Sequence, residues 1–379
     1  MFTSRIIGCG HCFPKKIVTN DDLAKIVDTN DEWIFSRTGI KERRIAGANE
    51  STASLGAEAA MMALRAAGER PEDVEAIILA TTTPDHPMPA TATKIQAMIG
   101  ASRAFAFDVQ AVCSGFIYAL SIADGLIRGL GKRGSVLVIG AEVMSRVVDW
   151  KDRSTCVLFG DGAGAVLLKG SEERADGGRC GILSTHLFSD GTFYDSLFVD
   201  RESSAPEGRG AIESADRESS APNNHGTIKM NGRTVFTIAI EKMTEVAALA
   251  LAENSLSIND IDWLVVHQAN KRIIDVVVER LGIYQVTERI DGRRHVAQAP
   301  SCTQRTAQAE QRIDEPANFR GLDTEKVIVT LESFANTGAA TIPTTLSIAH
   351  NDGRLKAGDL ILMVAMGGGF TWGAAVVRL

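Results

Sequence analysis

The sequence has little of what marks several large classes of protein. It lacks an excess of positive charge, since 40 Lys and Arg face 47 Asp and Glu for a net charge of −7, and this argues against nucleic acid as the main partner. No apolar run approaches membrane-spanning length, and residues 1–7 lack the long apolar core of a signal peptide. We therefore expect a cytoplasmic protein with no membrane partner and with its six cysteines reduced.

A complete set of metal ligands is also missing from the sequence. Cys9 and Cys12 have the spacing of a disulfide-exchange motif or of half a zinc site, but no second CxxC and no HxxxH occurs anywhere. We expect no metal, and we interpret this pair as the passage from a strand into a loop.

What is present indicates an α/β protein. A chain of 379 residues with 45% hydrophobic and 23% charged residues is ordinary for a globular protein of about two domain-sized units. Helical patterns at 51–67 and 90–99 alternate with apolar strand patterns at 74–81, 135–140 and 156–168. This alternation predicts a sheet with helices on both faces.

The second half of the chain repeats the pattern of the first. The segment 261–266 corresponds to 74–79, 326–338 to the strand and turn at Cys113, 359–364 to 135–139, and 367–377 to 160–167. The intervals also agree, because 136 − 113 gives 23 residues and 360 − 336 gives 24. We predict two similar halves, 1–173 and 174–379, whose strand ends meet at a shared site.

Two polar stretches interrupt this plan. Residues 199–226 are rich in Ser, Pro, Gly and Asn and contain the segment DRESSAP twice, and residues 284–323 show little periodicity. Both are typical of surface loops, and the repeat is better explained as a duplicated loop segment than as a binding motif.

Cys113 is the first candidate for chemistry. It stands on a predicted turn between a buried strand and a helix, where the helix N-terminus favours the thiolate. The alternative is that Cys113 is one more small core residue, since free cysteines are commonly buried and inert. The stretch alone does not separate these two interpretations.

Two further polar residues follow strands of the second half. His267 comes directly after the strand at 261–266, and Asn336 occupies the position that corresponds to Cys113. A cysteine, a histidine and an amide at one cleft suit acyl transfer through a thioester. The run Gly367 to Gly369 offers backbone N–H groups that can approach an oxyanion closely.

At this point the sequence resembles the 3-oxoacyl-[acyl-carrier-protein] synthase III family. The motifs that carry the resemblance are AVCSGF at 111–116, VHQAN at 266–270, ANTGAATIP at 335–343, GGGFTWG at 367–373, DEWI through RTGI at 31–40 and FGDGAGA at 159–165. The resemblance covers nearly the whole chain apart from the two polar stretches. It implies the thiolase fold, with two similar α/β halves stacked as a pseudo-twofold, five-layer αβαβα core, in a homodimer that initiates type II fatty acid synthesis.

The resemblance also implies the roles of the candidate catalytic residues. Cys113 attacks an acyl-CoA primer, which we expect to be acetyl-CoA, and holds the acyl group. His267 and Asn336 bind the thioester carbonyl of malonyl-ACP as it loses carbon dioxide, and the carbanion attacks the acyl group. The N–H groups of Cys113 and Gly368 form the oxyanion hole. No metal or redox cofactor is implied.

The binding residues are implied in the same way. The CoA and pantetheine site comprises Trp33, Arg37, Thr38, Arg153, Gly232, Phe236 and Asn270. Met88 and Leu158 belong to the acyl pocket, with Met88 on the loop through which one subunit closes the pocket of its partner. Lys271 and Arg272 adjoin the tunnel mouth and suit the acidic acyl carrier protein. The two polar stretches depart from the family pattern. We expect residues 199–226 to lie near that mouth, because they lead into residues 231–232, and residues 284–323 to lie on the distal face.

Three other functions compete with this one. A related acyltransferase or ketide synthase of secondary metabolism would use the same Cys-His-Asn site. A degradative thiolase is less favoured, because it uses a second cysteine as base and the terminal glycine motif carries none. A non-catalytic carrier-binding scaffold would require the loss of a triad residue, and all three are present.

Overall fold

The computed structural model describes residues 2–130, 134–172, 180–200, 226–283, 289–290, 293–294 and 324–379. The proposed boundary between the halves at 173/174, the second DRESSAP segment and nearly all of both polar stretches lie outside the described residues. The division into two halves at that boundary therefore stays a prediction.

The first sheet has five strands in the order β1-β7-β6-β4-β5. Its central strands β4 (Val74–Ala80) and β6 (Ser135–Val143) are parallel to each other, and β5 (Phe105–Val109) extends the parallel part. The other edge is antiparallel, through β7 (Asp161–Glu172) and β1 (Phe2–Cys12). Because both faces are covered, β6 is buried at all nine positions and its sequence is almost continuously apolar.

The second sheet repeats this order. Its strands run β11-β14-β15-β8, where β11 (Trp263–Val266) and β14 (Leu360–Gly367) are parallel. The antiparallel edge consists of β15 (Thr371–Arg378) and β8 (Gly181–Ser189). A single parallel bridge from Leu264 to Val327 stands where the first sheet has β5. The strand predicted at 326–331 is thus reduced to that bridge.

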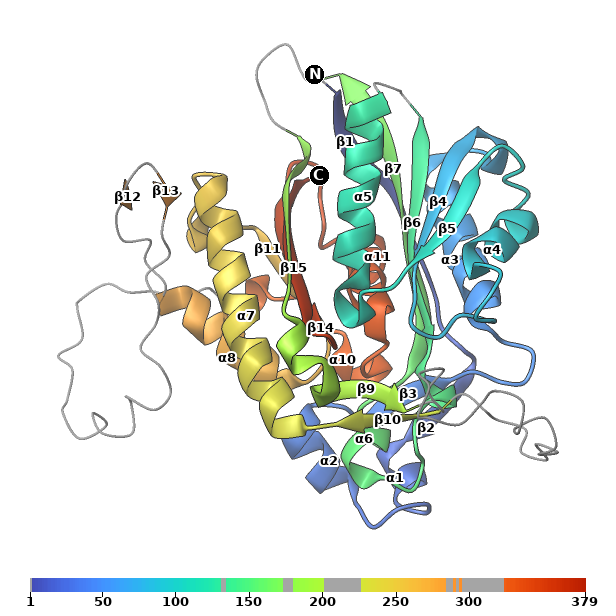
Figure 1. The fold of residues 1–379 in the computed structure, drawn as a ribbon, viewed down its shortest axis with the longest axis vertical. Helices are drawn as coiled ribbons and strands as arrows, with labels where there is room; N and C mark the ends of the chain where they lie inside the picture. The colour runs from blue at the N-terminus through green and yellow to red at the C-terminus, as the bar shows by residue number, and fades with distance from the viewer. Residues whose placement is uncertain are drawn as a thin grey trace, which may run out of the picture.

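Helices and sheets form five layers (Figure 1). Helices α3 (Thr52–Ala67) and α4 (Thr91–Ile99) cover the outer face of the first sheet, and α7 (Gly232–Glu253) and α8 (Lys271–Ile283) cover that of the second. Between the sheets lie α5 (Gly115–Leu130) and α11 (Thr341–Asn351). One apolar cluster joins these central helices to both sheets, and two others fill the outer interfaces. The predicted αβαβα core of the thiolase fold is confirmed.

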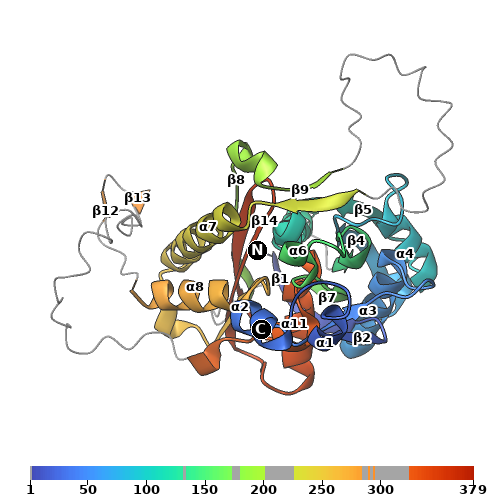
Figure 2. The same ribbon diagram turned by 90° about the horizontal axis from the view of Figure 1, so that it is seen from below.

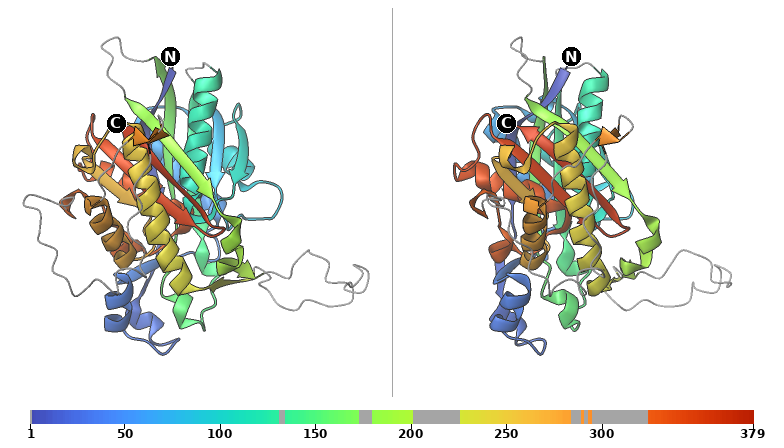
Figure 3. Two further views of the ribbon diagram at one scale, coloured as in Figure 1. Left: turned by 60° about the vertical axis from the view of Figure 1, so that its left-hand side comes forward. Right: turned by 90° about the vertical axis from the view of Figure 1, so that its left-hand side faces the viewer.

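The helix bounds follow from local capping. Ser51 and Asn231 accept backbone N–H groups at the starts of α3 and α7, so the predicted start at 51 is one residue early. The predicted start at 90 is also one residue early, and there Asp108 accepts the N–H groups of Thr91 and Ala92. Gly68 and Gly100 end α3 and α4 in the left-handed conformation. Figure 3 shows the long helix α7 crossing the strands of the second sheet.

The central helix α5 is unusually apolar. The window Val112–Gly129 has the length and composition of a membrane span, contrary to the expectation that no run approaches that length, and half of it is buried inside the protein. Its position between two sheets explains the composition, because apolar neighbours surround it on both sides.

Short elements close one end of the layers, seen from below in Figure 2. They are β2 (Lys16–Thr19), α1 (Asn20–Leu23), α2 (Asp31–Thr38), β3 (Glu42–Ile45), α6 (Arg153–Cys156), β9 (Leu197–Asp200), β10 (Thr227–Met230) and α10 (Leu331–Phe334). The described 3-10 turns are Pro71–Asp73, Val112–Ser114, Met144–Arg146, Gly191–Ser196, Ile258–Asp260, Thr324–Lys326 and Gly338–Ala340, and a small pair joins β12 (Arg289–Ile290) to β13 (Arg293–Arg294). Residues 156–160, predicted as strand, belong to this end, and Cys9 and Cys12 both lie within β1.

Candidate active site

One cavity joins the two halves at the end that the short elements close. It has a volume of about 260 Å³ and reaches from Trp33, on α2, inward to Cys113. Its walls come from both halves of the chain, and they include Cys113, His267 and Asn336. The three candidate catalytic residues are therefore brought together, although Cys113 and Asn336 lie more than 200 positions apart in the sequence.

Cys113 lies on the 3-10 turn that leads directly into α5. The preceding residue, Val112, has a φ of 47°, which is a strained value for a β-branched side chain. Cys113 is only 6% exposed, and burial raises the pKa of its thiol to about 12. The helix N-terminus lowers the pKa of this thiol, as the sequence indicated, but burial raises it by more. The thiol is therefore protonated at neutral pH.

His267 follows β11 and is 3% exposed. Its Nδ1 lies 2.7 Å from the hydroxyl of Thr341, the first residue of α11, which leaves Nε2 as the ring nitrogen for the cavity. Burial lowers the pKa of His267 to about 3. The ring is therefore neutral under ordinary conditions, so it can hydrogen bond to a carbonyl without bringing a charge.

Asn336 is oriented by its own turn. Its Oδ1 accepts the backbone N–H of Gly338 at 2.9 Å, so the amide nitrogen is left to donate into the cavity. The preceding residue, Ala335, has a φ of 57°, as Val112 has a positive φ before Cys113. Backbone bonds from Asn336 to Leu158 and from Gly160 to Asn336 fasten this turn to the first half.

The glycine run lies against the nucleophile turn. A Cβ on Gly367 would come within 2.5 Å of the backbone nitrogen of Cys113, so the close approach requires glycine. The Thr371 hydroxyl donates to the carbonyl of Ala111 at 2.9 Å and holds the two segments together. Gly368 borders a second cavity that also reaches Cys113.

The outer part of the first cavity carries aromatic and basic groups of the first half. The Trp33 ring has the guanidinium of Arg37 at 4.9 Å and that of Arg153 at 4.8 Å from its centroid. Trp33, Arg37 and Thr38 line the cavity, whereas Arg153 reaches it only through its contact with Trp33.

The second half supplies the facing wall. Gly232, Phe236 and Asn270 line the cavity as predicted, and Arg272 lies over Phe236 at 5.6 Å. Asn270 donates to the carbonyl of Arg37 at 3.1 Å and thereby joins α8 to α2. Lys271 is not a lining residue; its ammonium group forms an ion pair with Asp275.

The two predicted acyl-pocket residues lie apart. The second cavity, of about 740 Å³, is bordered by Cys113, Thr81, Thr82 and Pro87. Met88 stands next to Pro87, but it is 84% exposed and lines neither cavity. Leu158 lines the first cavity instead. In a single chain the structure does not bring Met88 and Leu158 together.

Three supporting residues were missed in the sequence. Glu142 is a buried acid at the end of β6, Thr341 holds His267, and Gln268 joins the turn after β11 to the segment before Asn336. Gln268 donates to the carbonyl of Val266 and accepts the N–H of Thr330 at 2.9 Å. An acid in an otherwise apolar strand was the available signal for Glu142. Among the described residues no group of three His, Cys, Asp or Glu side chains could hold a metal ion.

Comparison with protein families finds two matches along the chain. The model of 3-oxoacyl-[acyl-carrier-protein (ACP)] synthase III matches residues 107–191, and that of its C-terminal part matches 251–295 and 306–379. Among curated proteins, the beta-ketoacyl-[acyl-carrier-protein] synthase III of Paramagnetospirillum magneticum is 46% identical over 376 residues, which covers 99% of both chains.

Solved structures with the same arrangement include a synthase III and a polyketide priming enzyme. The 3-oxoacyl-[acyl-carrier-protein] synthase III of Aquifex aeolicus is 40% identical, with a TM-score of 0.79 over 99% of this chain and all of the other. The priming beta-ketosynthase of the R1128 polyketide pathway is 30% identical, also with a TM-score of 0.79, over 100% of this chain and 96% of the other.

Proposed function

Since this chain belongs to the 3-oxoacyl-[acyl-carrier-protein] synthase III family, we propose that it joins an acyl group held on Cys113 to a malonyl group held by acyl carrier protein. The chain is a condensing acyltransferase of fatty acid biosynthesis that uses an acyl-CoA. The chain is 46% and 40% identical to the synthase III proteins of Paramagnetospirillum magneticum and Aquifex aeolicus, against 30% for the priming beta-ketosynthase of the polyketide pathway, and this difference supports fatty acid over ketide synthesis.

The first half-reaction is transfer of the primer to Cys113. The Cys113 sulfur attacks the thioester carbonyl of acyl-CoA, its proton ends on the sulfur of the released CoA, and a new thioester forms. Backbone N–H groups of Cys113 and Gly368 stabilise the oxyanion of the tetrahedral intermediate, and each such donor typically lowers the barrier by about 3 kcal/mol. The protonated state of the thiol fits a site in which the charge exists only during transfer.

The second half-reaction is decarboxylative condensation. Malonyl-ACP loses carbon dioxide, and the electron pair of the broken C–C bond becomes an enolate. The Nε2 side of His267 and the amide nitrogen of Asn336 stabilise its oxygen. The carbanion then attacks the Cys113 thioester and forms 3-oxoacyl-ACP, and the Cys113 sulfur leaves as a thiolate that takes up a proton from solvent. Loss of carbon dioxide generates the nucleophile without a strong base, so the proposed chemistry is complete without a metal or redox cofactor.

The observation that carries this proposal is the meeting of Cys113, neutral His267 and an oriented Asn336 amide in one cavity. The Trp33 end of that cavity is the proposed entrance for CoA and for the pantetheine arm, with Arg37, Thr38 and Arg153 towards the nucleotide and Gly232, Phe236 and Asn270 along the arm. Arg272, exposed beside that entrance, is proposed to meet the acidic carrier protein together with Lys271.

We also propose a homodimer in which Met88 of each chain closes the acyl pocket of the other. The outermost position of β5 in its sheet and the exposed side chains of Met88 and Phe105, 84% and 51% exposed, support a partner at this edge. Sedimentation equilibrium should give twice the mass of the chain, and a monomeric mass would contradict the proposal. A cytoplasmic location, with no membrane or nucleic acid partner, completes it.

The decisive experiment is intact-protein mass spectrometry after incubation with acetyl-CoA. We expect one acetyl group, located on Cys113 by peptide mapping, that is discharged by malonyl-ACP with release of carbon dioxide. Cys180, a partly exposed cysteine outside both cavities, provides the control. Cys180→Ala should be acetylated normally and Cys113→Ala not at all. Absence of label from wild-type Cys113 with every acyl-CoA tested would refute the function.

A further inference from the structure

The loop after β4 is tied to a buried carboxylate. Glu142, with no exposed surface, accepts the backbone N–H of Thr82 at 3.0 Å and that of Thr83 at 3.1 Å. The hydroxyls of Thr81, at 3.2 Å, Thr82, at 3.0 Å, and Thr83 also contact its oxygens. Three consecutive threonines therefore close around one acid, an arrangement that we call the Glu142 clamp.

The hydroxyl directions in the Glu142 clamp are determined by other bonds. The Thr81 oxygen accepts the N–H of Thr83 at 3.1 Å, and the Thr83 oxygen accepts the N–H of Val143 at 2.9 Å. The hydroxyls of Thr81 and Thr83 therefore donate their hydrogens to Glu142. The two backbone N–H groups also donate, so the site is built from donors that suit a carboxylate, and these donors offset part of the burial that raises the pKa of Glu142 to about 7.

The Glu142 clamp lies between two parts of the candidate active site. Thr81 and Thr82 border the second cavity beside Cys113. On the other side, a Cβ on Gly338 would lie 2.9 Å from Cγ of Glu142, and the N–H of Gly338 is the group that orients Asn336. The carboxylate thus packs against the cavity wall on one side and the Asn336 turn on the other.

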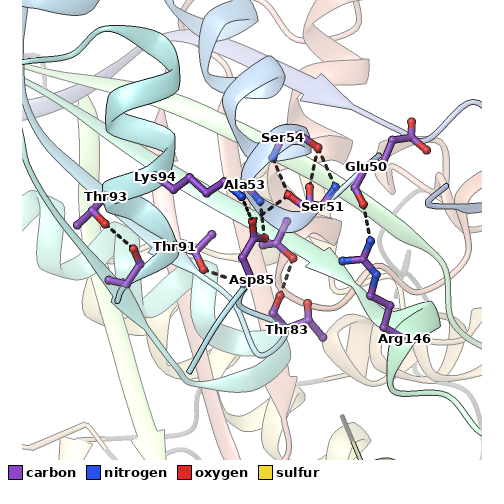
Figure 4. A network of polar contacts seen from close by, with 12 residues as sticks. Glu50, Ser51, Ala53, Ser54, Thr83, Asp85, Thr91, Thr93, Lys94 and Arg146 are labelled. Atoms are coloured by element: carbon purple, nitrogen blue, oxygen red, sulfur yellow. Dashed lines mark hydrogen bonds and ion pairs between the residues drawn. The ribbon is translucent and has the colours of Figure 1, made fainter. Parts of the chain in front are cut away.

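The same loop has a second, outer attachment that Figure 4 displays. Asp85 accepts the N–H of Ala53 at 3.1 Å and the hydroxyl of Ser51 at 3.0 Å, and it forms an ion pair with Lys94 at 2.8 Å. This attachment fastens the loop to α3 and α4, away from Cys113. Two carboxylates therefore hold this loop, Glu142 from β6 and Asp85 from the loop itself. Only Glu142 contacts the residues that form the cavity wall.

We propose that Glu142 is a positioning residue that determines acyl-chain specificity, by fixing the wall formed by Thr81 and Thr82 next to Cys113. This inference rests on the proposed function, because it assumes that the second cavity takes the acyl chain. With the wall fixed, the space beside the sulfur is constant, and the enzyme selects primers by length. When the Glu142 clamp is broken, the wall can move outward, and we expect the enzyme to accept longer acyl chains more readily.

The test compares primers in Glu142→Gln, which keeps the shape of the side chain but places an NH2 group among donors. We expect the ratio of kcat/KM for hexanoyl-CoA to that for acetyl-CoA to rise at least about fivefold, mainly through a lower KM for hexanoyl-CoA. Asp85→Asn is the matched control, and it should lower the melting temperature but keep the wild-type ratio. Mass spectrometry of acylated Cys113 provides an independent measure of each rate.

Two further variants decide the matter if Glu142→Gln does not fold. Thr83→Val removes one hydroxyl of the clamp and should shift the ratio in the same direction, whereas Thr83→Ser keeps that hydroxyl and should restore the wild-type value. A folded Glu142→Gln or Thr83→Val protein with an unchanged ratio would overturn the inference. Failure of wild-type Cys113 to take up any acyl group would instead overturn the proposed function.

Discussion

The two sheets use equivalent positions for different purposes. Register pairs Ala80 with Gly140 in the first sheet and Val266 with Val364 in the second, so Thr81 corresponds to His267. The Thr81 hydroxyl donates to buried Glu142 and forms part of the wall of the second cavity, whereas His267 lines the first cavity. The residue after the strand thus supports the structure in one half and is the proposed catalytic group in the other.

The same difference between a supporting residue and a cavity residue is found on the neighbouring strands β6 and β14, two residues after Gly140 and Val364. Glu142 corresponds to Met366, and the methionine lines the cavity where the acid is enclosed by threonines. The turns that carry Cys113 and Asn336 both begin with a residue of positive φ. The fold therefore supplies polar positions at matching strand ends, and the identity of each residue decides which of them meets substrate.

The largest expected effect is on the rate of condensation, which we propose depends on side chains of the second half of the chain. Either His267→Ala or Asn336→Ala should lower the condensation rate about 100-fold or more, because each removes a donor to the enolate. Acetylation of Cys113 should persist, since the first half-reaction uses the backbone of the Cys113 turn. Quenched-flow kinetics of each half-reaction measures this. His350→Ala, an exposed histidine at the end of α11, should behave as wild type, and loss of both half-reactions together would contradict the separation.

The next effect tests the contact between the halves at Gly367. Gly367→Ala places a Cβ within 2.5 Å of the Cys113 nitrogen, and neither backbone segment can yield easily because Thr371 holds them together. We expect loss of most acetylation of Cys113 together with a lower melting temperature. Gly125→Ala in α5 meets nothing within 4 Å and should stabilise the protein by up to about 1 kcal/mol. Normal activity in Gly367→Ala would show that the contact is not required.

A smaller effect concerns how the free energy of unfolding depends on pH. His267, in the second half, acts at acid pH, and Cys113, in the first half, acts at alkaline pH. The folded pKa of His267, about 3, lies below its usual 6.5, so the unfolded chain binds more protons and stability falls as pH drops through this window. The Cys113 pKa, raised from 9.0 to about 12, makes stability fall as pH rises from 9 to 12.

Each group should contribute a slope of about 1.4 kcal/mol per pH unit within its window. Urea unfolding across pH should show His267→Asn without its acid slope and Cys113→Ala without its alkaline slope, each relative to wild type. A variant that keeps the wild-type slope would show that its side chain is not buried as described.

The smallest effect compares the aromatic residues that the halves offer to the CoA end of the cavity. Trp33, between Arg37 and Arg153, should stack on the nucleotide, while Phe236 beside Arg272 should contact the pantetheine arm. Trp33→Ala should raise the KM for acetyl-CoA about tenfold with little change in kcat. Phe236→Ala should raise the KM for both acetyl-CoA and malonyl-ACP. Equal effects of Trp33→Ala on both substrates would break this distinction.

The sequence predicted the parts of this molecule that depend on order along the chain. Apolar periodicity and the matching intervals around Cys113 and Asn336 indicated two similar sheets, and the predicted residues Cys113, His267 and Asn336 do line one cavity. It did not predict properties that arise from packing. The sequence left open whether Cys113 is a thiolate favoured by the helix N-terminus or a buried core thiol, and only its burial in the structure raises the pKa to about 12.

The Glu142 clamp was missed for a similar reason. Glu142 is separated from Thr81–Thr83 by about sixty residues, and nothing local indicates that three hydroxyls will turn to one acid. The fifth strand of the second sheet was overpredicted because the apolar run at 327–329 satisfies a strand pattern, although only Val327 pairs with β11. Pairing partners, unlike periodicity, are set by the tertiary structure.

The helix that begins at Cys113 also bears on how the chain folds during synthesis. Helix α5 is sandwiched between a first sheet whose strands all precede residue 173 and a second sheet whose strands β14 and β15 begin only at residue 360. One face of its apolar surface therefore stays uncovered while some two hundred further residues are added. We therefore expect the helix that carries the nucleophile turn to expose apolar surface during synthesis, and the core around it to be completed only after β14 and β15 have been made.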